Sequence, residues 1–195
     1  SVLVQNSIAI ISTALFVLVP SLLPRTIAGI PEKESVAFLF MFLTFFFFIS
    51  SYIEKSRGKS YIYALLAGIS TAIMALTWGG TGLVFLTIAA AVLFAFILGK
   101  IDKTRLYSYG IWILVSFGLP MQFSSRFNIG NLLYSLSSGS VFAIFFLMAI
   151  HIYIIEKLET KEKYRRFFEK IKLPSLFISI IVTVILFVLI TSVYF

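Results

Sequence analysis

Residues 35–53 read SVAFLFMFLTFFFFISSYI, and this stretch decides the fold. It contains no charged residue, and its length is close to the ~20 apolar residues that a helix needs to cross the hydrocarbon core of a bilayer. Backbone polar groups in lipid must bond within the structure, so the run from Phe45 to Phe48 cannot lie in an open sheet. The stretch therefore predicts a transmembrane helix.

The composition of the whole chain agrees with this interpretation. Of its 195 residues 60% are hydrophobic and 12% are charged, and the mean hydropathy is +1.05. A soluble domain usually has about 45–50% apolar and about 25% charged residues. The excess of apolar residues excludes a water-soluble enzyme and indicates an integral membrane protein. The absence of cysteine excludes disulfides and thiolate metal sites.

Six further segments resemble the first in length and apolar character. The seven predicted spans are 4–23, 35–53, 61–78, 81–99, 106–123, 137–155 and 174–194. They predict an all-α polytopic bundle that forms one transmembrane domain over residues 1–195. The chain lacks an initial Met and ends directly after an apolar run, so we expect it to be a segment of a longer protein.

The basic residues predict the orientation of these spans. Thirteen of the sixteen Lys and Arg residues lie in the loops after the second, fourth and sixth spans, including a cytoplasmic basic loop at 156–172. Loops rich in Lys and Arg stay in the cytoplasm. We therefore expect a cytoplasmic N-terminus and an outer C-terminus. The net charge of +8 belongs to these loops, so it indicates a bilayer rather than nucleic acid as the partner.

The predicted outer loop at 24–35, PRTIAGIPEKES, is the candidate for chemistry. Glu32 and Glu34 supply hard oxygen donors of the kind that bind Mg²⁺ or Mn²⁺, and Arg25 is near enough in sequence to reach the same site. A structural interpretation is also open. With Pro31 as the first helical residue, both acids would lie in the first turn, where the helix dipole favours negative charge.

Small residues in the 61–78 segment predict close helix packing. Ala67, Gly68, Ser70, Thr71 and Ala75 lie within a few turns of one another, and small side chains let membrane helices approach closely. Trp78-Gly79-Gly80 predicts a tight turn into the next span.

The loop and the turn together resemble a known family. The run from Pro20 to Glu34, which contains Arg25-Thr26-Ile27-Ala28-Gly29 and the acidic pair, resembles the second acidic motif of the oligosaccharyltransferase catalytic subunit. Trp78-Gly79-Gly80, about 44 residues after Glu34, matches a Trp-Gly-Gly of that family. The archaeal single-subunit enzymes look most similar because their loops are compact.

The resemblance implies both a fold and an activity. The fold is the membrane domain of a type C glycosyltransferase. The activity is transfer of a glycan from a polyprenyl or dolichyl (pyro)phosphate carrier to Asn in Asn-x-Ser/Thr of an acceptor protein, on the outer face of the cell membrane. By the same resemblance, Glu32 and Glu34 ligate Mn²⁺ or Mg²⁺, and Arg25 lies beside that site.

The resemblance also implies family parts that this sequence lacks. The first Asp-x-Asp loop would precede residue 1, and a soluble domain with Trp-Trp-Asp would follow Phe195. We therefore expect the segment alone to be inactive. Two other interpretations stay open: another polytopic glycosyltransferase that uses a polyprenyl-linked sugar, and a non-enzymatic transporter or scaffold. The spans carry no central charge, which disfavours an ion-coupled transporter.

Overall fold

The computed structural model describes residues 2–17, 33–128, 130, 132, 135–155 and 179–185 of the chain. Every regular element in these ranges is helical, which confirms the all-α prediction. The basic loop at 156–172 and most of the acidic loop, 24–32, lie outside the described residues. The same is true of residues 18–23 of the first predicted span and of residues 174–178 and 186–194 of the last.

The helices begin and end close to the predicted boundaries. They are α1 (Val2–Val17), α3 (Lys33–Ile53), α4 (Arg57–Thr77), α5 (Thr81–Ile97), α6 (Lys103–Phe123) and α8 (Leu136–Ile150), followed by a π-helix, η2 (His151–Ile155). A short 3₁₀ helix, η1 (Ser125–Phe127), follows α6, and residues 179–185 are helical. The largest shift is at α4, which starts four residues before the predicted span at 61.

Three of the described helices are long and apolar enough to cross a membrane: Lys33–Ile53, Arg57–Thr77 and Leu136–Tyr153. At 17 residues, α5 is apolar but shorter. The structure thus supports an integral membrane protein, while the count of seven spans and their orientation stay predictions.

The helix α6, which is not among these three helices, packs against protein on several sides. Its Trp112 and Tyr109 are almost fully buried, as are Ser108 and Ser116. It contacts α4 most extensively and also α3 and α8. A helix that meets protein on several sides can carry polar and aromatic residues that a lipid-facing helix cannot.

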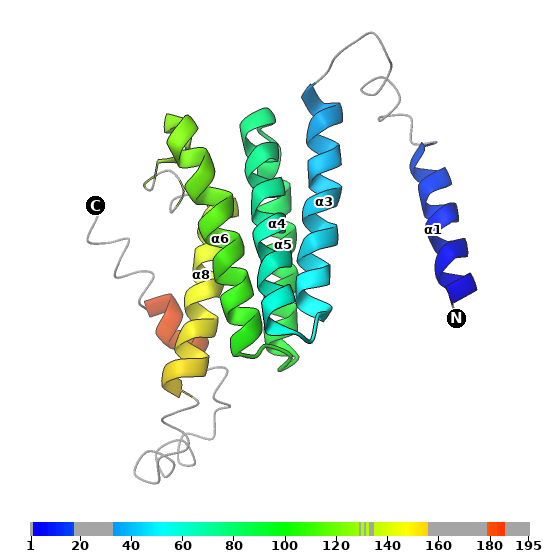
Figure 1. The fold of residues 1–195 in the computed structure, drawn as a ribbon. Helices are drawn as coiled ribbons and strands as arrows, with labels where there is room; N and C mark the ends of the chain where they lie inside the picture. Colours follow the sequence, from blue (N-terminus) through cyan, green and yellow to red (C-terminus); the bar gives the residue numbers. More distant parts are fainter. Residues whose placement is uncertain are drawn as a thin grey trace.

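Figure 1 shows how these helices are arranged. The helices α3, α4 and α6 lie side by side, with α4 packed against both neighbours, while α5 and α8 pack against each other. Consecutive helices run in alternating directions, as short connections require. The helix α1 stands apart in this view, and its side chains from Asn6 to Leu15 are exposed.

The predicted small face of α4 is buried between α3 and α6. Ala67, Gly68, Ser70, Thr71 and Ala75 are all buried, which confirms the prediction of close packing. The tightest contact is at Gly68, where an added Cβ would lie 2.7 Å from the Cβ of Val115 and 3.2 Å from the carbonyl oxygen of Trp112. The α4–α6 distance therefore depends on the absence of a side chain at this position.

Buried hydroxyl groups link the same three helices at two levels. Near the middle of the bundle, the Trp112 indole Nε1 donates to Thr71 Oγ1 at 3.0 Å. Thr71 Oγ1 in turn donates to the carbonyl oxygen of Ala67 at 2.8 Å and lies 3.3 Å from Thr44 Oγ1. At the end near Lys100, Ser60 Oγ lies 2.8 Å from Ser108 Oγ. Ser51 and Ser60 each donate to the other's carbonyl oxygen at 2.8 Å. Each hydroxyl has a partner, so its burial is not penalised.

We expect Gly68→Ala to destabilise the bundle, because the new methyl group would push α6 away from α4. Overpacking of this kind costs about 1–3 kcal/mol. The measurement is thermal unfolding of the full chain in detergent. Gly118→Ala in α6 is the matched control, since a Cβ there meets nothing within 4 Å. Equal midpoints for the two variants would contradict the packing assigned to Gly68.

We expect Thr71→Val to destabilise the protein as well, for a different reason. The isosteric methyl group fills the same space but leaves the buried Trp112 Nε1–H without its acceptor. An unsatisfied buried donor costs about 1–3 kcal/mol. The control is Thr87→Val, because Thr87 is exposed and bonds only the carbonyl oxygen of Leu83 among the described contacts. Similar unfolding free energies for both variants would argue against the role of the Trp112 bond.

Candidate functional site

The acidic loop ends at the first turn of α3. Glu34 lies in that turn and is partly buried, as the structural interpretation of the acidic pair expects for this residue. A carboxylate there is stabilised by the positive end of the helix dipole. Arg25 and Glu32 lie outside the described residues, so the structure places one of the three predicted site residues.

The Trp-Gly-Gly turn lies next to the start of α3. Trp78 ends α4, and its backbone N–H donates to the carbonyl oxygen of Met74 at 2.8 Å. Its ring meets the ring of Phe38 edge-on, with centroids 5.8 Å apart. Phe38 is one helical turn beyond Glu34 on α3, so the two motifs noted in the sequence lie together at one end of the bundle.

The turn needs glycine because the Trp78 ring covers it. A Cβ added at Gly80 would lie 2.1 Å from the far edge of that ring. Gly80 is also the residue before the first turn of α5. The tight predicted turn is therefore confirmed, and its compactness comes from the indole folding back over its own glycine.

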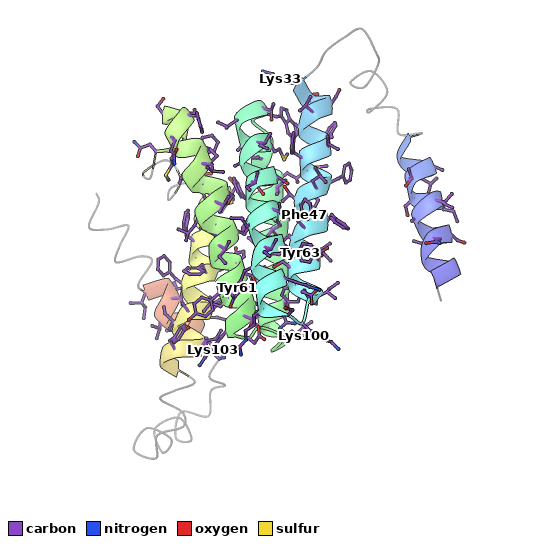
Figure 2. The ribbon with its side chains drawn as sticks, in the orientation of Figure 1. Lys33, Phe47, Tyr61, Tyr63, Lys100 and Lys103 are labelled. Atoms are coloured by element: carbon purple, nitrogen blue, oxygen red, sulfur yellow. The ribbon has the colours of Figure 1, made fainter. Side chains whose placement is uncertain are left out.

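Figure 2 shows which end of the bundle this is. Lys33, beside Glu34, lies at the upper end in this view, and Lys100 and Lys103 lie at the opposite end. The Glu34–Trp78 end is thus separated by the length of α3 from the end that carries the described basic loops.

A cavity with hydroxyl groups in its wall opens near the same turn. It has a volume of about 270 Å³. Its polar lining comes from Thr81, Ser135, Ser137 and Ser138, and its apolar lining from Phe85, Phe127 and Leu132, with Gly79 and Gly82 at its edge. The sequence did not predict this cavity, although the cluster of serines between residues 135 and 140 was a visible signal.

The arrangement does not by itself form a metal site. Within the ranges that the structure describes, no three His, Asp or Glu side chains come together to hold an ion. Glu34 can provide one carboxylate donor, and the second predicted donor, Glu32, lies beyond the described start of α3. The metal prediction therefore depends on a residue whose position is not described.

A family comparison covers nearly the whole chain. Residues 2–195 match the family described as oligosaccharyl transferase STT3, N-terminal. The chain belongs to this family. The prediction of an oligosaccharyltransferase relative, made from the acidic loop and the Trp-Gly-Gly turn, is confirmed at that level.

A plant relative supports the same assignment. The chain is 30% identical over 98 residues to the dolichyl-diphosphooligosaccharide–protein glycosyltransferase subunit STT3A of Oryza sativa subsp. japonica. The match covers 50% of this chain and 12% of the rice protein. No solved structure gives a significant match to the chain.

Proposed function

We propose that this chain is part of a membrane oligosaccharyltransferase that catalyses protein N-glycosylation. The donor is a glycan on a polyprenyl or dolichyl (pyro)phosphate, and the acceptor is Asn in Asn-x-Ser/Thr of a protein. The family match over residues 2–195 carries this proposal, and the activity named for the rice relative agrees with it. The match covers 12% of the rice protein, so the activity is proposed for the full-length protein and not for this segment alone.

The Glu34–Trp78 end of the bundle is the part of this chain that faces the reaction. The contact of Phe38 with Trp78 supports this assignment, since it joins the first turn of α3 to the Trp-Gly-Gly turn. Through Phe38, that turn packs against the helix whose first turn carries Glu34. Arg25 then provides a positive charge near the phosphate of the carrier.

Glu32 and Glu34 are the residues that would hold Mn²⁺ or Mg²⁺. Carboxylate oxygens are suitable donors for either ion, and the position of Glu34 at the edge of the apolar span fits a site at the membrane surface. When bound, such an ion would stabilise negative charge on the departing phosphate.

The active site lies on the outer face of the cell membrane in this proposal. Support comes from the two described loops at the far end, 54–56 and 98–102, which together with the adjacent helix starts carry six Lys and Arg residues. The archaeal single-subunit type is the finer assignment. Its support is the compactness of the loops, since three residues join α4 to α5.

The test is glycan transfer to an Asn-x-Ser/Thr peptide by the full-length protein in detergent or liposomes. We expect Glu34→Gln and Glu32→Gln each to lower the rate on the order of a hundredfold, because each removes a charge from the site where the leaving group is stabilised. Removal of divalent ions by a chelator should have a similar effect on the unmodified protein.

Glu54→Gln is the matched control. Glu54 directly follows the last residue of α3, at the opposite end of the helix from Glu34, so its replacement should leave the rate unchanged. A normal rate in the variant with both Glu32 and Glu34 replaced would contradict the site assignment. No transfer by the unmodified full-length protein with any lipid-linked glycan would contradict the function itself.

A further inference from the structure

A small cavity lies between α3 and the first turns of α6, at the end of the bundle that carries Lys100 (Figure 2). The volume open to water is about 10 Å³, which is at the lower limit for one water molecule. A sugar, a lipid headgroup or a peptide cannot enter such a space. Its polar lining comes from Ser51 and Tyr52 of α3 and from Arg105, Ser108 and Tyr109 of α6.

The Nε–H group of Arg105 is a buried donor at this cavity. Arg105 Nη1 pairs with Asp102 Oδ2 at 2.9 Å, and the backbone N–H of Arg105 donates to Asp102 Oδ1 at 2.9 Å. The side-chain Nε is buried too, and no group within the described ranges accepts a hydrogen bond from it. An unpaired buried donor is costly, so folded proteins supply a partner from the chain or from ordered water.

The nearby ring of Tyr52 does not replace an oxygen acceptor. The guanidinium Cζ of Arg105 lies 5.0 Å from the ring centroid, which places the positive charge over the ring. A contact between an N–H and an aromatic ring is only a weak hydrogen bond. The Tyr52 hydroxyl donates to the carbonyl oxygen of Lys100 at 3.0 Å. Arg105 Nε–H therefore still needs an acceptor.

The hydroxyl groups on the other side of the cavity have lone pairs to offer but no protons. Ser60 Oγ donates its one proton to the carbonyl oxygen of Ser51 at 2.8 Å, and Ser51 Oγ donates to that of Ser60 at 2.8 Å. Ser60 Oγ also lies 2.8 Å from Ser108 Oγ, so the proton of this bond comes from Ser108. The oxygens of Ser51 and Ser108 can thus accept hydrogen bonds, and both residues line the cavity.

We propose that this cavity binds one structural water molecule. The water accepts from Arg105 Nε–H and donates to Ser108 Oγ and Ser51 Oγ, which gives it the three hydrogen bonds that are typical of buried water. A cation does not fit beside the guanidinium, whereas a water satisfies a donor on one side and two acceptors on the other. The water links the first turn of α6 to the last turns of α3. It lies at the opposite end of the bundle from the proposed active site and does not depend on the proposed function.

The first test is a structure of the full-length protein in a lipid nanodisc, at a resolution that shows ordered water at other buried sites. We expect a single peak within about 2.7–3.2 Å of both Arg105 Nε and Ser108 Oγ. The same structure of Ser108→Ala should lack the peak. No peak in the unmodified protein, a larger ligand in the cavity, or a protein group bonded directly to Arg105 Nε would overturn the proposal.

The second test compares thermal unfolding midpoints of full-length variants. Arg105→Lys keeps the charge beside Asp102 but has no donor at the position of Nε, and Ser108→Ala removes the acceptor. Since either change breaks the same water bridge, the decrease in the double variant should be smaller than the sum of the single decreases.

Arg105→Lys combined with Ser116→Ala is the matched control. Ser116 is also buried on α6, but its described hydrogen bond goes to the carbonyl oxygen of Ile113 in its own helix. The two decreases in this pair should add. Additive decreases for Arg105→Lys and Ser108→Ala as well would contradict a water that joins the two side chains.

Discussion

The close approach of α4 to its two neighbours is the constraint on which the rest of the structure depends. In a bilayer the lipid is as apolar as the side chains, so helices associate through packing and hydrogen bonds rather than through exclusion of water. The small face of α4 supplies both. Gly68 lets the α6 backbone come near, and that short distance brings the Trp112 indole N–H within reach of Thr71 Oγ1. A wider gap would leave this buried N–H without its acceptor.

The same packing brings the two sequence motifs together. Because α3 and α4 are antiparallel and in close contact along their lengths, the end of α4 must lie beside the start of α3. Trp78 and Glu34 are distant in sequence, yet Phe38 connects the turn that carries one to the helix that carries the other. The position of the candidate site is thus a consequence of helix packing, and the loops only complete it.

Much of the fold could be predicted from the sequence because membrane spans have a strong local signal. The apolar run from Phe38 to Ile53 predicted a helix without any long-range information. The turn Trp78-Gly79-Gly80 likewise predicted the boundary between two helices. The bond between His151 Nδ1 and Ser179 Oγ, at 2.8 Å, could not be predicted, since it joins residues of two separate helical segments. The hydroxyl-lined cavity was missed for the same reason. Its serines and Thr81 come from different helices, and only packing brings them together.

The length of α3 links the two ends of the molecule. Its 21 residues rise about 31 Å, close to the ~30 Å thickness of the hydrocarbon core. If Glu34 lies at one membrane surface, Lys55 must then lie at the other. The acidic first turn and the basic loop lie at opposite ends of α3. The length of the helix explains both, since it places each charge at a polar surface of the membrane. The length of α3 therefore sets the distance of Glu34 from the membrane surface at which Lys55 lies.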